Sequence, residues 1–348
     1  MEAQGMISLI SDELNGSAGT ISKIDPKMIE KISDVLAAAI KKGKKIIFMG
    51  NGGSSADAQH LAAEFTGRYL MEREPMDAMA LSNIAPVTAI GNDYSFETVF
   101  QKQVKAHAKK GDVVIGISTS GNSKNIIEAM RAAKEKGAVT VSFTGPGGMM
   151  KDMADHALMI PSKETPRIQE GYMVAGHIIC GLTERSVFGK KAVFIDRDDT
   201  IAKDVPYCGR PEDMKLFKGV PGSIAKLNKA GYLVIMITNQ SGVARGRFTE
   251  DDLAEIHKKM ISDIEKGGGR IDDIFYCPHH PDDGCGCRKP AAGMGVAAVA
   301  KHKINTKASF MIGNSDADVG FGKAIGCKPI KVSEKFTFSD AVDRILNG

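Results

Sequence analysis

The stretch that most constrains the fold lies at residues 191–198, where an apolar run ends in two carboxylates. Residues 192–195 are Ala-Val-Phe-Ile, and Asp196 and Asp198 follow with one residue between them. Such a run is typical of a parallel strand buried on both faces, and open α/β sheets place their functional groups at the carboxyl ends of such strands. A catalytic unit therefore begins near residue 191, and the chain before it is long enough to form another.

The length of the chain favours two domains. It has 348 residues, whereas single domains usually have roughly 100–200. The apolar content of 43% and charged content of 25% are ordinary for a globular protein. We expect an α/β protein with two doubly wound parallel-sheet domains, at residues 1–189 and 190–348.

The charge and hydropathy patterns argue against nucleic-acid and membrane partners. The formal net charge of +4 is small for this length, and the basic residues are scattered along the chain. No apolar run approaches the roughly 18 residues that span a bilayer, and the N-terminus has no basic-then-apolar signal pattern. We therefore expect a cytoplasmic protein whose partners are small molecules.

Two strand-turn-helix units in the first half carry candidate phosphate-binding turns. The apolar run 44–50 leads into Asn51-Gly52-Gly53, and the run 112–117 leads into the hydroxyl-rich segment 118–123. A turn that feeds a helix N-terminus offers free backbone N–H groups and a partial positive charge to an anion. A plain connection is the alternative for the glycine turn, and simple N-capping is the alternative for the serines.

Four side chains of the first half have the spacing of a metal site. His60 and Glu64 are four residues apart in a predicted helix, and Gln169 and His177 are eight apart in another that follows Pro166. Each spacing places the two residues on roughly one side of a helix. The four can hold one metal ion, although a solvated polar pair explains His60 and Glu64 equally well.

These motifs resemble the phosphoheptose isomerases of the sugar-isomerase fold, over residues 1 to about 188. The matching segments are 51–64, 91–93 and 118–123, together with Gln169 and His177. The resemblance implies a catalytic zinc ion bound by His60, Glu64, Gln169 and His177. It also implies substrate contacts from a larger set: Asn51, Gly52, Gly53, Ser54, Asn92, Asp93, Ser118, Thr119, Ser120, Ser123 and Gln169.

The chemistry of that family suits these residue types. Converting a ketose into an aldose moves a proton between C1 and C2 through an enediol, which needs a base, an acid and a group that stabilises the oxyanion. Glu64 is the expected base and His177 the expected acid, and zinc would polarise the carbonyl. The family's active sites lie between subunits, so the resemblance also implies a homotetramer.

The second half carries, one after another along the chain, groups that suit phosphoryl transfer. Asp196 can attack phosphorus, Asp198 can protonate the leaving group, and Thr238 and Lys289 can hold phosphoryl oxygens. Asn314 follows a last apolar run, 309–313, and would join Asp196 and Asp198 in binding Mg²⁺. A solvated acidic turn is the alternative for the two aspartates. In this order the groups resemble the haloacid-dehalogenase phosphatases.

A cluster of cysteines lies between these groups. Cys277, His279, Cys285 and Cys287 offer three thiolates and an imidazole, a set that suits a closed, structural tetrahedral Zn²⁺ site. We expect this zinc to hold the loop that carries Arg288 and Lys289 against the substrate. With residues 204–212, the cluster resembles the heptose 1,7-bisphosphate phosphatases, over residues 191 to about 345.

Two positions depart from the pattern of that family. Glycine usually stands where this chain has Asp199, and aspartate where it has Asn314. Asp199 adds a negative charge beside the nucleophile, whereas Asn314 removes one from the Mg²⁺ site. Asp316 or Asp318 is a candidate to replace the lost charge.

Taken together, the two resemblances predict a bifunctional enzyme of nucleotide-activated heptose biosynthesis, with a separate kinase acting between its two steps. Three alternatives remain. The second half can be a histidinol-phosphate-type phosphatase or an inactive scaffold for the isomerase. The first half can be a sugar-phosphate sensor, although a sensor would not need the four metal-ligating side chains together.

Overall fold

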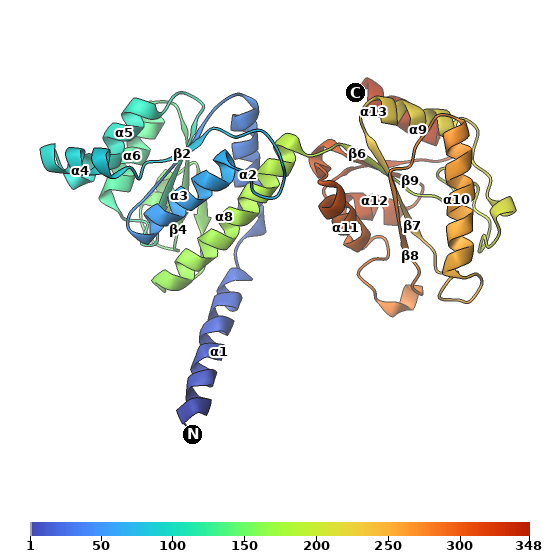
Figure 1. Ribbon diagram of the computed structural model, residues 1–348, viewed down its shortest axis with the longest axis horizontal. Helices are drawn as coiled ribbons and strands as arrows, with labels where there is room; N and C mark the ends of the chain where they lie inside the picture. The colour runs from blue at the N-terminus through green and yellow to red at the C-terminus, as the bar shows by residue number, and fades with distance from the viewer. Residues whose placement is uncertain (1) are drawn as a thin grey trace. The chain divides into compact units, whose positions relative to one another are not determined.

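The structure, a computed structural model, describes residues 2–348 and consists of two compact units. The first unit ends at Val187 and the second begins at Phe188. Each unit is a parallel sheet with helices on both faces (Figure 1). The predicted α/β class with two doubly wound domains is confirmed.

The sheet of the first unit has five parallel strands in the order β2-β1-β3-β4-β5. Its strands are β1 (Ile46–Gly50), β2 (Ala78–Ala80), β3 (Val113–Ser118), β4 (Val139–Thr144) and β5 (His156–Met159). Strands β1 and β3 are buried along their whole length, because helices cover both faces. Both strands end at the predicted phosphate-binding turns.

The helices of the first unit connect and flank these strands. They are α1 (Glu2–Ile21), α2 (Pro26–Lys41), α3 (Gly53–Thr66), α4 (Ile84–Asp93), α5 (Val99–His107), α6 (Lys124–Glu135), α7 (Met150–Met153) and α8 (Thr165–Phe188), with a 3₁₀ turn at Phe96–Thr98. The predicted start at Asp25-Pro26 is confirmed, since the Asp25 carboxylate caps α2 at Lys27 N. Helix α1 extends away from the sheet (Figure 1).

The sheet of the second unit also has five parallel strands, in the order β10-β9-β6-β7-β8. Its strands are β6 (Ala192–Ile195), β7 (Leu233–Asn239), β8 (Asp273–Cys277), β9 (Phe310–Gly313) and β10 (Lys328–Lys331). Strand β6 is central, and its residues alternate between two cores: Val193 and Ile195 face one, and Ala192 and Phe194 face the other. The carboxyl end of β6 therefore presents Asp196 in the middle of the sheet.

Helices also flank this second sheet. They are α9 (Val220–Lys229), α10 (Glu250–Lys266), α11 (Gly293–His302), α12 (Asp316–Ala324) and α13 (Phe338–Asn347), with 3₁₀ turns at Pro211–Asp213, Pro281–Asp283 and Thr306–Ala308. Capping boxes begin α10, α12 and α13. No helix within residues 2–348 is long and apolar enough to cross a membrane.

Candidate active sites

Helices α3 and α8 bring three of the predicted metal ligands of the first unit together. His60 Nε2 lies 2.8 Å from His177 Nε2 and 3.4 Å from Glu64 Oε1. One ligand atom from each of the three lies within 4.8 Å of the other two. Two imidazole nitrogens and a carboxylate that converge on one point form a donor set that suits Zn²⁺ and leaves room for substrate.

Gln169 of α8, the fourth predicted ligand, contacts α3 at Asp57, about one turn before His60. Its Nε2 donates a hydrogen bond of 2.8 Å to Asp57 Oδ2. A Cβ added at Gly53 would lie 2.6 Å from the same nitrogen, so only glycine leaves room for this amide. Burial raises the pKa of Asp57, partly offset by Gln169 and by His60. Sequence reasoning did not identify Asp57.

The two predicted phosphate-binding turns lie at the carboxyl ends of neighbouring strands, β1 and β3. Asn51 exchanges two side-chain hydrogen bonds of 2.9 Å with Asn125, at the start of α6. Ser123 is the N-cap of α6, yet its hydroxyl bonds to Ser118 Oγ at 2.8 Å and caps nothing. The capping alternative is therefore wrong for Ser123.

The other predicted substrate-binding residues of the first unit lie as follows. Thr119 and Ser120 belong to the turn after β3, and the Ser120 hydroxyl accepts a hydrogen bond from Asn122 N. Ser54 is buried and bonds to the Tyr172 hydroxyl at 2.9 Å. Asn92 and Asp93 end helix α4 on an exposed surface and bond to each other. Their contact with substrate stays a prediction.

A buried ion pair between Arg73 and Glu184, which sequence reasoning missed, lies next to this site. Glu184 of α8 is fully buried and accepts hydrogen bonds from the backbone of residues 69–71 and from Arg73 Nε. The loop held in this way stacks the Tyr69 ring on His177, with ring centroids 5.6 Å apart. The two partners are 111 residues apart, so no local pattern could have indicated the pair.

A polar cavity of about 210 Å³ opens at the carboxyl end of the second sheet. It is lined by Asp196, Asp198, Asp199, Asp204, Asn239, Lys289, Asn314, Ser315 and Ala317. The structure thus brings the predicted nucleophile, the predicted acid and the predicted Mg²⁺ ligand Asn314 to one place. Carboxylate and amide oxygens around a small cavity suit a hard cation such as Mg²⁺.

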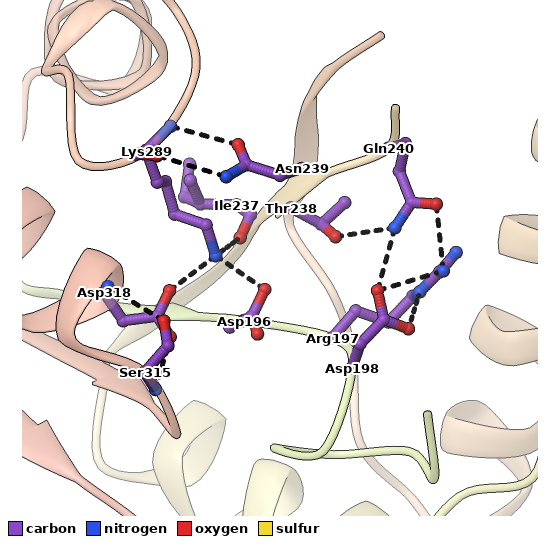
Figure 2. A network of polar contacts seen from close by, with 10 residues as sticks. All are labelled: Asp196, Arg197, Asp198, Ile237, Thr238, Asn239, Gln240, Lys289, Ser315 and Asp318. Carbon is purple, nitrogen blue, oxygen red and sulfur yellow. Dashed lines mark hydrogen bonds and ion pairs between the residues drawn. The ribbon is translucent and has the colours of Figure 1, made fainter. Parts of the chain in front are cut away.

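Lys289 contacts Asp196, the predicted nucleophile, at this cavity. Its Nζ donates to Asp196 Oδ1 and Asp318 Oδ1, each at 2.6 Å, and to the carbonyl of Ile237 at 2.9 Å (Figure 2). Burial raises the pKa of the Asp196 carboxyl; Lys289 opposes this effect, and the neighbouring Asp318 adds to it. A cation at the cavity would therefore favour the ionised nucleophile.

A second network holds Asp198 (Figure 2). Arg197 Nε donates to Asp198 Oδ1 at 2.8 Å, and Arg197 Nη2 donates to Asp198 Oδ2 at 3.1 Å. Gln240 Nε2 donates to Asp198 Oδ2 at 3.0 Å and to Thr238 Oγ1 at 2.9 Å. The network links the predicted acid to the predicted phosphate-binding hydroxyl, and its Arg197 and Gln240 were not predicted.

The structure explains one departure from the family pattern and bears on the other. Asp199 has φ +50°, a left-handed conformation that favours glycine but that aspartate tolerates. Asp316 is exposed and pairs with Lys331, and Asp318 is buried against Lys289, so neither lines the cavity. Neither carboxylate therefore replaces the missing one in the cavity wall, but the charge of the buried Asp318 still acts on Asp196, so compensation by Asp318 stays a prediction.

The three cysteines and the histidine of the predicted structural site form a compact group after β8. Cys277 Sγ lies 3.6 Å from Cys285 Sγ and 3.4 Å from Cys287 Sγ, and His279 Nδ1 lies 3.2 Å from Cys287 Sγ. Around a tetrahedral zinc with Zn–S bonds of about 2.3 Å, ligand atoms would lie roughly 3.5–3.8 Å apart. The donor set and its spacing therefore fit zinc.

The first half of the chain matches known isomerases. Residues 12–145 match the SIS domain family. A phosphoheptose isomerase from Burkholderia pseudomallei is 51% identical over 165 residues, which cover 47% of this chain and 84% of that relative. The chain belongs to the phosphoheptose isomerase family. A solved phosphoheptose isomerase from Neisseria gonorrhoeae is 36% identical, with 99% of it covered and a TM-score of 0.48.

The phosphoheptose isomerase domain accounts for about half of the chain, and the other half has different relatives. Residues 286–344 match the HAD-hydrolase-like family. A solved D,D-heptose 1,7-bisphosphate phosphatase from B. bronchiseptica, complexed with magnesium and phosphate, is 30% identical; the match covers 45% of this chain and 98% of that one, with a TM-score of 0.43. The two family matches show that the chain joins a phosphoheptose isomerase to a HAD-hydrolase-like domain.

Two predicted substrate residues of the HAD-like half, Thr238 and Arg288, are absent from the cavity lining, and Thr238 is fully buried. The buried Nη1 of Arg288 has no hydrogen-bond partner in the described part of the chain. An unpaired buried guanidinium nitrogen is costly, so a bound anion would stabilise it. The contact of Arg288 with substrate stays a prediction.

Proposed function

We propose that this protein catalyses two steps of heptose metabolism. The first unit isomerises sedoheptulose 7-phosphate to D-glycero-D-manno-heptose 7-phosphate, and the second removes the 7-phosphate from D-glycero-D-manno-heptose 1,7-bisphosphate. The observation that carries the proposal is the presence, in one phosphoheptose isomerase chain, of the His60-Glu64-His177 cluster and of the Asp196-Asp198-Lys289 cavity.

In the isomerase reaction Glu64 takes a proton from C1 of the ketose, and the electron pair of that C–H bond forms the C1–C2 double bond of the enediol. His177 supplies a proton to the O2 oxygen or to the neighbouring carbon, and the aldose forms when C2 has gained a proton and the O1 hydroxyl has returned one to these side chains. Zinc held by His60, Glu64, Gln169 and His177 would polarise the carbonyl. Tyr69, stacked on His177, excludes water from that ring.

In the phosphatase reaction an oxygen of Asp196 attacks phosphorus, and the bond between phosphorus and the C7 oxygen breaks. Asp198 gives its proton to the departing sugar oxygen. Asp198 then takes a proton from water, which attacks the aspartyl phosphate and releases inorganic phosphate and free Asp196. Mg²⁺ held by Asp196, Asp198 and Asn314 would neutralise the phosphoryl oxygens.

The Cys277 cluster supports a structural role for a second zinc ion. Lys289 lies two residues after Cys287, so fixing the cluster fixes the lysine that contacts Asp196. None of the six cysteines, all in the described part of the chain, forms a disulfide, as we expect in a reducing cytoplasm. We place the enzyme there, with a separate kinase that adds the 1-phosphate between the two steps.

We also propose that the chain works as a homotetramer assembled through the isomerase unit. Helix α1 supports this, because it exposes five large apolar side chains: Met6, Ile7, Leu9, Ile10 and Leu14. An exposed apolar stripe of this kind is typical of an interaction surface.

One crossed experiment tests both activities. Isomerisation of sedoheptulose 7-phosphate and phosphate release from the 1,7-bisphosphate are measured for the wild type, Glu64→Gln and Asp196→Asn, with histidinol phosphate as a control substrate. We expect each variant to lose its own activity by about 10³-fold or more and to keep the other. If the wild type isomerises sedoheptulose 7-phosphate but releases no phosphate, the second unit is a scaffold. If it prefers histidinol phosphate to the heptose bisphosphate, the second unit is a histidinol-phosphate-type phosphatase.

A further inference from the structure

Gln240 lies where the two halves of the phosphatase site meet. It follows β7 directly, is 5% exposed, and uses both amide hydrogens: Nε2 donates to Asp198 Oδ2 and to Thr238 Oγ1. Figure 2 shows the amide facing both side chains. Gln240 is therefore the one side chain in this view that touches both the predicted acid and the predicted phosphate-binding hydroxyl.

A hydrogen bond from Arg197 fixes the orientation of the Gln240 amide. Arg197 Nη2 donates to Gln240 Oε1 at 3.0 Å. A guanidinium has donors only, so the amide oxygen must face Arg197 and the amide nitrogen must face Asp198 and Thr238. Arg197 is 2% exposed and also grips both Asp198 oxygens. The fork geometry of the guanidinium allows these contacts at once, which a lysine could not reproduce.

This arrangement has a consequence for each partner. The Thr238 oxygen accepts from Gln240, so its hydroxyl hydrogen is left to donate to another oxygen, as phosphate binding requires. The Asp198 carboxylate is held by three donors in one orientation at the cavity wall. Asp198 lines the cavity, whereas Thr238 is fully buried and absent from the lining, so the contact of its hydroxyl with a phosphoryl oxygen is part of the proposal.

We propose that Arg197 and Gln240 form a clamp that positions Asp198 toward the leaving-group oxygen and the Thr238 hydroxyl toward the phosphoryl oxygens. Both are positioning residues, since neither lines the cavity. The inference rests on the proposed phosphatase function of the second unit. It goes beyond that function by assigning a role to two buried side chains that serve no other part of the reaction.

The test compares leaving groups. Single-turnover release is measured with heptose 1,7-bisphosphate, whose sugar oxygen needs a proton to leave, and with p-nitrophenyl phosphate, whose phenolate does not. Gln240→Met keeps the side-chain length but removes both donors. We expect the sugar phosphate to slow about 10–100-fold more than the nitrophenyl ester, which is part of the roughly 10²–10⁴-fold that a general acid contributes. Inhibition by inorganic phosphate should also weaken, by about 10-fold, because Thr238 is no longer oriented.

Two further variants separate positioning from stability. Arg197→Lys should give the same change in leaving-group ratio, and combining it with Gln240→Met should add little, because the two act as one unit. Ser223→Ala removes a hydrogen bond between α9 and α13, away from the cavity, and should lower stability without changing the ratio.

The outcomes are distinct. An equal slowing of both substrates by Gln240→Met, with unchanged inhibition by phosphate, would mean that the network only fills the core and would overturn the clamp while the phosphatase function stands. A wild type that hydrolyses neither substrate would overturn the phosphatase function itself, and the clamp with it.

Discussion

At the scale of single residues, the charge of Arg197 affects more than its direct partners. His257 of α10 is 6% exposed, and its Nε2 has no hydrogen-bond partner in the described part of the chain. Burial, helped by the positive charge of Arg197, lowers the pKa of His257 from 6.5 to about 4. The folded protein therefore keeps this imidazole neutral at a pH where an exposed histidine is already protonated.

This difference predicts a loss of stability in mild acid. The unfolded chain takes up a proton at His257 near pH 6.5 and the folded chain only near pH 4, so the free energy of unfolding of the second unit falls as the pH drops through that window. At about 1.4 kcal/mol per pH unit, the loss reaches roughly 3 kcal/mol. Urea titrations at pH 7, 5 and 4 measure this loss of stability. Hydrogen exchange of α10 peptides at the same pH values assigns the loss to the second unit.

His257→Leu is the control, because it removes the titrating group. The stability difference between the wild type and this variant should change with pH by about the same 3 kcal/mol. A difference that stays constant from pH 7 to 4 would contradict the buried, neutral state of His257.

Residues in local motifs could be predicted from the sequence, and residues that act across the fold could not. Asp196 and Asp198 follow an apolar strand, and His60 and Glu64 share one helical face, so their spacing indicates them. Gln240 also lies beside a predicted residue, Thr238, but its function depends on a guanidinium 43 positions away. Nothing in the local sequence indicates such a contact.

At the scale of elements, the loop between β8 and α11 combines a candidate metal site with Lys289, a predicted phosphate-binding residue. Cys277 ends β8, and Lys289 begins the return toward α11. Asn239 at the end of β7 bonds to both the backbone N–H and the carbonyl of Lys289, at 3.0 and 3.2 Å. Zinc on one side and Asn239 on the other would fix this loop, which has little regular structure of its own.

Removing one ligand should therefore affect only the phosphatase. We expect Cys285→Ser to contain one zinc ion per chain instead of two and to lose phosphate release by about 10-fold or more, with isomerisation unchanged. Metal content by mass spectrometry and the two activity assays measure this. Cys327→Ser, at another free cysteine of the same unit, should keep both ions. A wild type that holds only one zinc ion per chain would show that the cluster is not a zinc site.

The central strands were predictable, whereas three of the four edge strands, β2, β8 and β10, were not. Apolar runs form the strands β1, β3, β6, β7 and β9, because helices bury both faces of the sheet there. β2 has only three residues, β8 is half-buried, and β10 has exposed lysines and a proline. Edge strands need one paired side only and tolerate proline and charge, so their sequences lack the apolar signal.

At the scale of the whole molecule, a single copy of the chain leaves several large apolar side chains of helix α1 exposed. Ile7 and Leu14 are 66% and 67% exposed and lie on one stripe with Ile10. The Glu13 carboxylate pairs with Arg167, and the Ser17 hydroxyl bonds to Glu170, so the second half of α1 is attached to α8, the helix that carries Gln169 and His177. Covering this stripe would therefore also act on the isomerase site.

We expect Ile10→Glu combined with Leu14→Glu to separate the proposed tetramer, because two charges would be buried in an apolar interface. Sedimentation velocity should show a smaller species, isomerisation should fall with the loss of sites shared between subunits, and phosphate release should stay unchanged. Ser8→Glu adds a charge to an exposed position of the same helix that is not three or four residues from Ile7, Ile10 or Leu14, and it should leave the assembly intact. If the double variant sediments like the wild type, the apolar stripe of α1 does not hold the subunits together.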